Sequence, residues 1–65
     1  MKDFIEVVDR SSGHPVKALI RLSSVAYLEL EDPTNTGLFG VNLWDARIEI
    51  SREDLDRILA ALEQL

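Results

Sequence analysis

Few side chains in this sequence are of the types that perform catalysis, and they lie in one short segment. Ser11 and Ser12 precede Gly13, and the single histidine, His14, follows it and stands before a proline. A histidine-activated serine is the nucleophile of many hydrolases, but that chemistry also needs a carboxylate that orients the imidazole ring. No acid is placed for that role, and a turn of this composition exposes its side chains. We therefore interpret His14 as a turn residue and predict no catalytic residue.

Metal ions and nucleotides need donor groups that the sequence does not supply. The chain has no cysteine and one histidine, which excludes an ordinary zinc site. Oxygen-bearing side chains are frequent from Glu31 to Thr36, but their spacing differs from a calcium-binding EF-hand and Pro33 restricts the loop. The turn before the C-terminal helix lacks the glycines of a phosphate-binding loop. We predict no metal site, no cofactor and no enzyme activity.

Three large apolar side chains lie on strand faces opposite the predicted core. Tyr27 shares its face with two glutamates, and Leu38 and Trp44 lie opposite the apolar face of their strand. Exposed apolar patches mark interfaces, and Trp and Tyr are frequent binding hot spots. A second small core that buries these side chains is the other interpretation, and the sequence leaves both open.

The chain is acidic, with twelve acids, seven bases and a net charge of −5. Nucleic-acid binding relies on clustered Lys and Arg, so no direct binding to nucleic acid is expected. Solubility is the simplest role of such a surface, and attraction to a basic partner is the alternative. The candidate partner-binding residues are the three apolar side chains and three nearby acids: Tyr27, Glu29, Glu31, Asp32, Leu38 and Trp44.

Alternating apolar and polar residues predict five short strands. They cover residues 3–9, 16–22, 25–31, 38–44 and 47–50. Turn formers around Gly13 predict a hairpin between the first two strands. In the third strand, Ala26, Leu28 and Leu30 are assigned to one face. Gly40, inside the fourth strand, predicts a bulge or a close approach of another backbone segment.

A C-terminal helix is predicted over residues 52–64. Ser51 is a typical N-cap, and Asp54 resembles the acidic half of a capping box. Glu53 and Arg57 have the i,i+4 spacing of a favourable ion pair. The apolar stripe that packs on the sheet consists of Leu55, Ile58, Leu59, Leu62 and Leu65.

Sixty-five residues without cysteine form one domain with a small core and no disulfide. The predicted class is α+β, with about five antiparallel strands in a bent sheet or small open barrel and one C-terminal helix packed on it. The acidic N-terminus is unlike a secretory signal, and no segment approaches the ~20 apolar residues of a membrane span. We therefore expect a cytoplasmic protein without membrane insertion.

The order of these features resembles the FlbD family of small flagellar proteins, also called SwrD. The matching segments are residues 5–10 with Gly13, 16–22, 25–29, 41–43 and 48–51. The chain departs from the family pattern at Ser23 and Ser24, and at Asp45 and Ala46, where the family has Asn- and Gly-containing turns. The resemblance implies the same fold and a non-enzymatic role near the flagellar motor.

The sequence thus predicts a small protein-binding module that uses an exposed apolar and aromatic patch, with self-pairing into a homodimer left open. The alternative is an acidic, phage-type inhibitor that mimics nucleic acid and blocks a host nucleic-acid-binding complex, in the manner of an anti-CRISPR protein.

Overall fold

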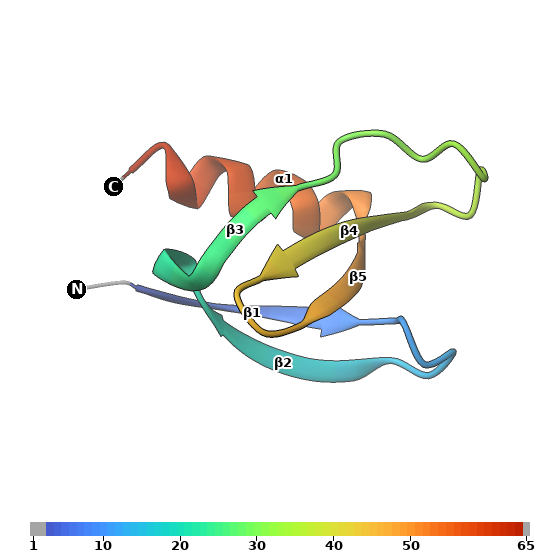
Figure 1. Cartoon of the computed structure of the whole chain (residues 1–65), viewed down its shortest axis with the longest axis horizontal. Coiled ribbons are helices and arrows are strands. Elements are labelled where there is room, and N and C mark those ends of the chain that lie inside the picture. The colour runs from blue at the N-terminus through green and yellow to red at the C-terminus, as the bar shows by residue number, and fades with distance from the viewer. Residues whose placement is uncertain (1–2, 65) are drawn as a thin grey trace.

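The computed structural model describes residues 3–64 and consists of five antiparallel strands in two sheets, with one helix at the C-terminal end (Figure 1). This arrangement confirms the predicted α+β class, and the sheets do not close into a barrel. In chain order the elements are β1 (Phe4–Asp9), β2 (Val16–Arg21), the 3-10 turn η1 (Leu22–Ser24), β3 (Val25–Leu28), β4 (Leu38–Leu43), β5 (Arg47–Ser51) and α1 (Arg52–Leu62).

β1 and β2 form the predicted hairpin. Their register runs without a break from Phe4 opposite Arg21 to Asp9 opposite Val16. Gly13 turns the chain with φ of +88°, a conformation that residues with a side chain rarely adopt. The Asp9 carboxylate accepts a hydrogen bond from the Ser11 backbone N–H at 3.0 Å, which fixes the start of the turn.

β3 is shorter than predicted and is irregular. It ends at Leu28 rather than at residue 31, and its register with β4 shifts between Val25 and Tyr27. The extra residue, Ala26, moves the strand out of strict alternation. As a result Val25 and Leu28 pack against the core, whereas Ala26 and Leu30 are exposed. The single-face assignment of Ala26, Leu28 and Leu30 was therefore wrong.

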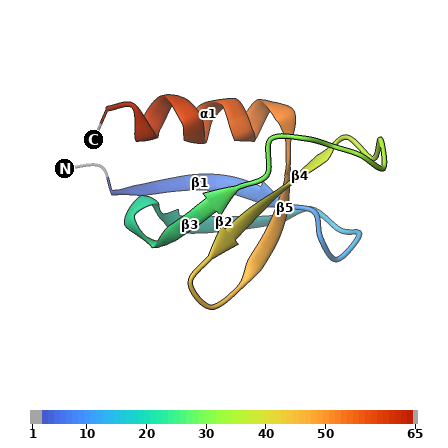
Figure 2. The ribbon, with the colours of Figure 1, turned by 45° about the horizontal axis from the view of Figure 1, so that its top comes forward.

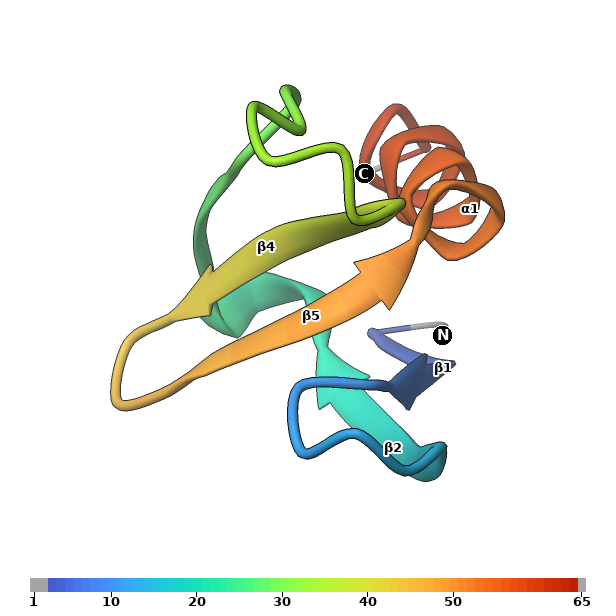
Figure 3. The same ribbon diagram turned by 90° about the vertical axis from the view of Figure 1, so that its right-hand side faces the viewer.

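β4 and β5 form a regular hairpin. The pairs run from Leu38 opposite Ser51 to Asn42 opposite Arg47, and the Leu43 N–H donates to the Ala46 carbonyl oxygen at 2.8 Å across the turn. This turn projects from the rest of the molecule (Figures 2 and 3). Residues 44–46 are consequently placed at a free end of the three-stranded sheet.

The helix begins as predicted and is tied to β1 in an unpredicted way. The Ser51 hydroxyl accepts a hydrogen bond from the Asp54 N–H at 3.4 Å. The Asp54 carboxylate does not complete a capping box but accepts the Val8 N–H at 3.0 Å. Arg57 pairs with Asp54 at 3.1 Å instead of the expected Glu53.

The core lies between the two sheets and the helix. Five side chains are almost completely buried: Val7, Val41, Ile50, Leu55 and Ile58. α1 runs along one side of the sheets (Figure 2) and contributes two of these residues. Leu59 and Leu62 of the predicted stripe are half-buried, and Leu65 lies outside the described residues.

The two sheets meet where β1 ends beside β5. The Arg10 N–H donates to the Glu49 carbonyl oxygen at 2.8 Å, and the Glu49 N–H donates to the Asp9 carboxylate at 3.3 Å. Across the molecule the strands therefore follow the order β2, β1, β5, β4 and β3, with β2 and β3 at the two ends. Over residues 3–64, no helix has the length and apolar character of a bilayer span.

Candidate functional site

The outer face of the three-stranded sheet carries a network of charged side chains centred on Arg47. Its guanidinium donates to both carboxylate oxygens of Glu29, from Nε at 2.9 Å and from Nη2 at 3.1 Å. Arg47 Nη1 donates to Glu49 at 3.1 Å, and the Asn42 amide donates to Glu29 at 2.9 Å. We call Glu29, Asn42, Arg47 and Glu49 the Arg47 cluster.

Gly40 makes room for the Arg47 cluster. A Cβ atom at this position would stand 2.5 Å from Glu29 Oε2 and 2.6 Å from Arg47 Nη2. β4 pairs with β5 in an unbroken register through Gly40, so there is no bulge in that pairing. The predicted close approach does exist, but side chains make it and not another backbone segment. Because Gly40 has no side chain, the Glu29–Arg47 ion pair can lie directly over β4, the central strand of the sheet.

The Arg47 cluster keeps Glu29 ionised. The hydrogen bond from Arg47, followed by the one from Asn42, lowers the pKa of Glu29 from its ordinary 4.5 to about 2. The same contacts, to Glu29 first and then to Glu49, raise the pKa of Arg47. Glu29 was predicted to be a partner-binding acid, but both of its oxygens already bind Arg47. Its charge is balanced within the molecule.

Removing Arg47 is expected to return the pKa of Glu29 from about 2 towards 4.5, as followed by an NMR titration of the side-chain carboxyl carbon. Because the folded-state pKa lies below the ordinary value, the contribution to stability is complete above about pH 4.5 and is lost as the pH falls towards 2. Arg47→Met tests the main cause, and Asn42→Ala should give a smaller rise. An unchanged titration in Arg47→Met would contradict the assigned hydrogen bonds.

The two predicted aromatic contact residues lie near each other at the turn end of this face. Tyr27 pairs with Asn42, near the end of β4, and Trp44 follows Asn42 by two residues in the turn after β4. Trp44 is 76% exposed and Tyr27 is 61% exposed. Among residues 3–64, no second core covers either side chain. Of the two interpretations of the sequence, exposure and burial in a second core, exposure is therefore correct for Tyr27 and Trp44. We call Tyr27 and Trp44 the aromatic end of the sheet.

Leu38 is separate from the aromatic end. It lies at the other end of β4, opposite Ser51, and it is half-buried. Trp44 follows Leu38 by six positions along extended chain, a span of about 20 Å at ~3.4 Å per residue. The Arg47 cluster occupies the space between them. The structure therefore does not bring the three apolar residues together in one patch.

Asp32 closes the loop that links β3 to β4. Its Oδ1 accepts hydrogen bonds from the N–H and hydroxyl of Thr36 at 3.1 and 3.2 Å, and its Oδ2 accepts the Gly37 N–H at 2.6 Å. These bonds, that from Gly37 first, lower the pKa of Asp32. Asn35 and Gly37 have positive φ, as turns of this kind require. Asp32 thus holds the loop together.

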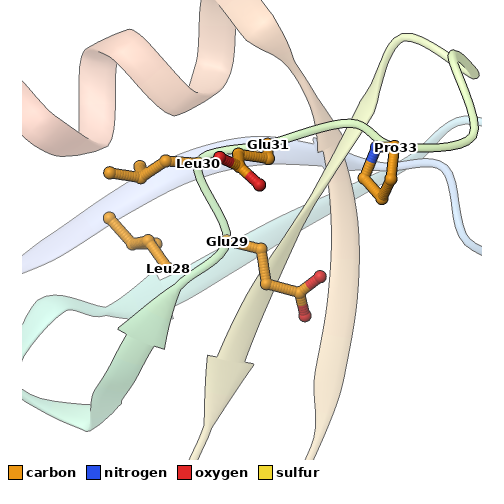
Figure 4. Close-up of a pocket in the computed structure, with 5 residues that line it drawn as sticks. All are labelled: Leu28, Glu29, Leu30, Glu31 and Pro33. Carbon is orange, nitrogen blue, oxygen red and sulfur yellow. The ribbon is translucent and has the colours of Figure 1, made fainter.

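A shallow, open hollow lies beside this loop (Figure 4). Its volume is about 490 Å³, and it is lined by Leu28, Glu29, Leu30, Glu31 and Pro33. In Figure 4 the Glu29 carboxylate points away from Leu30 and Glu31, and it accepts a hydrogen bond from Arg47. Among residues 3–64, no three acidic or histidine side chains gather in a way that could hold a metal ion.

The sequence interpretation missed exposed apolar side chains elsewhere, chiefly on the β1–β2 hairpin. Leu19 is 68% exposed, and Phe4, Val16 and Leu30 are each about half exposed. A signal for Leu19 was present, because it falls on the same face of β2 as Lys17 and Arg21. The position of Leu19 between two cations on one strand face indicates that its side chain is exposed.

Comparisons of the chain with protein-family models, with curated proteins and with solved structures gave no match. The resemblance to the FlbD family stays a prediction.

Proposed function

We propose that the chain is a small, non-enzymatic protein-binding module that contacts its partner through the aromatic end of the three-stranded sheet. The exposure of Trp44 carries this proposal, because it is the most exposed large apolar side chain among the described residues. Covering such a side chain contributes roughly 1.5–3 kcal/mol. The proposal places the module in the cytoplasm, and the FlbD resemblance adds a flagellar setting to it.

The surroundings of Trp44 support a preformed contact surface. Tyr27 lies on a strand that is paired to β4, and Asn42 beside it is held by Glu29. Arg47, at the other side of the turn, is fixed by its two carboxylate partners. Rigid aromatic anchors lose little conformational entropy on binding, which favours affinity.

The acidic-inhibitor alternative receives less support from the geometry. A nucleic-acid mimic needs accessible acids in a row that follows the spacing of phosphates. Four arginines instead pair with five of the twelve acids, and Asp9 and Asp32 accept backbone N–H groups. The remaining acids come from five different parts of the chain: Glu6, Glu31, Asp45, Glu53 and Glu63.

Trp44→Ala is expected to leave folding intact and to weaken partner association by about 2 kcal/mol, or roughly 30-fold. Thermal unfolding measures whether folding is intact. Quantitative co-purification of bound protein from cells that encode the chain measures partner association. Trp44→Phe should lose less, because it keeps an aromatic ring in place. Equal recovery of partner by Trp44→Ala and the unaltered chain would remove Trp44 from the interface.

The same variants separate the alternatives. If Trp44→Ala abolishes a dimer seen by sedimentation equilibrium, the partner at the aromatic end is a second copy of the chain. Binding that falls steeply with salt and is lost in Glu31→Lys would favour the acidic inhibitor. Glu31 is preferable to Glu29 for this test, since a change at Glu29 also removes the Arg47 ion pair.

A further inference from the structure

Among residues 3–64, no strand lies beside the outer edge of β2. β1 lies on one side of β2, and β2 forms the boundary of the molecule on the other side (Figures 1 and 3). The Leu22 N–H donates to the Asp3 carbonyl oxygen at 2.6 Å, so the backbone of Leu22 faces the β1 side. Because this direction alternates along a strand, the N–H and C=O groups of Lys17, Leu19 and Arg21 face outward.

The other strand edges are occupied or unsuitable. The Val8 N–H of β1 donates to Asp54, and the Arg10 N–H donates to Glu49 of β5. Within the described part of the chain no strand pairs with the outer side of β3, but β3 has only four residues and a register shift in its pairing with β4. Short, bulged edges resist the addition of a strand. β2 has six residues in regular register, so it is the edge best suited to accept another strand.

The side chains along this edge define a charge pattern. Lys17 and Arg21 flank the exposed Leu19, and β2 contains no acid. The Arg21 guanidinium lies 5.0 Å from the centre of the Phe4 ring and 3.6 Å from Asp3. In a chain of net charge −5, this edge presents Lys17 and Arg21 on either side of an apolar side chain, with the charge of Arg21 partly balanced by Asp3.

We propose that the β2 edge binds an extended segment of a partner protein as an added strand. The segment carries acidic residues opposite Lys17 and Arg21 and an apolar residue opposite Leu19. Main-chain hydrogen bonds supply affinity in this mode, and alternate side chains supply specificity. A second copy is disfavoured, because antiparallel pairing centred on Leu19 would place Lys17 opposite Arg21 of that copy, and opposed like charges are destabilising. This contact is separate from the aromatic end.

The test is an NMR titration of the whole chain with a short peptide containing Glu-Thr-Val-Thr-Glu, a sequence that reads the same in either strand direction. We expect millimolar peptide to shift the amide signals of Lys17, Leu19 and Arg21. A matched peptide with both Glu replaced by Lys should bind at least about tenfold more weakly. No shift at β2, or equal shifts with both peptides, would overturn the proposal.

Two variants check the mode of binding. Leu19→Pro removes a backbone N–H that faces away from β1 and makes no hydrogen bond in the β1–β2 pairing. It should therefore abolish the peptide-induced amide shifts while β1 and β2 stay paired. Lys17→Glu, at an exposed position, should weaken binding of the acidic peptide and strengthen binding of the basic one. Trp44→Ala should leave peptide binding unchanged, which separates this proposal from that of the aromatic end. A dimer of the free chain that Leu19→Pro abolishes would overturn the assignment to a partner protein.

Discussion

Leu55→Ala is expected to lower the free energy of unfolding by about 3 kcal/mol, because truncation of a buried leucine loses its contacts and leaves a cavity. Leu55 is fully buried between α1 and the sheets. A domain of this length is marginally stable, so the change should leave a large fraction of the chain unfolded at 37 °C. Urea denaturation followed by far-ultraviolet circular dichroism measures the effect.

The matched control is Leu19→Ala, the same chemical change at a side chain that is 68% exposed. Surface substitutions of this kind change stability by about 0.5 kcal/mol or less. Equal losses at Leu55 and Leu19 would show that the helix does not pack on the sheets as described.

Asp54→Ala is expected to cost about 2 kcal/mol of stability, since it leaves the Val8 N–H without its acceptor. The Asp54 carboxylate accepts hydrogen bonds from Val8 at 3.0 Å and from Arg57 at 3.1 Å. Among the described residues, Asp54 is the one charged residue that is buried. Chemical denaturation gives the loss, and hydrogen exchange should show faster exchange at the Val8 amide.

Asp56→Ala is the control for this second prediction. Asp56 also pairs with an arginine of α1, Arg52 at 3.2 Å, but both side chains are well exposed. Exposed ion pairs contribute about 0–1 kcal/mol. If Asp56→Ala destabilised the domain as much as Asp54→Ala, the tie between α1 and β1 would not be the source of the effect.

The elements that sequence predicted well are those fixed by local signals. The turn at Gly13 and the alternation of β2 fix the first hairpin, and Ser51 with the leucine spacing fixes the helix. These features depend on residues within a few positions of one another, and local patterns report on them directly.

The features that sequence did not predict depend on pairing between distant segments. The bulge at Ala26 is visible only against β4, and it ends the alternation that suggested a longer strand. Asp54 was interpreted as a capping residue, whereas its carboxylate accepts the N–H of Val8, 46 residues away. No local pattern around Asp54 encodes that contact.

The candidate site was predicted only in part, because its arrangement also depends on pairing between distant segments. The sequence left open whether Trp44 and Tyr27 were exposed or buried in a second small core, and the structure shows both side chains exposed. Their separation from Leu38 follows from the register of β4, and the capture of Glu29 by Arg47 needs β3 and β5 to lie on either side of Gly40. Strand order had to be known before either could be seen.

Site-specific photo-crosslinking from position 44 shows directly whether the aromatic end of the sheet contacts a partner protein. A photoreactive phenylalanine analogue replaces Trp44 in the full chain, expressed in cells that encode it, and the same analogue at the exposed helix position Glu53 serves as the control. We expect an adduct with one defined protein from position 44 that is absent from position 53. No adduct from position 44, or the same adducts from both positions, would contradict a binding role for the aromatic end.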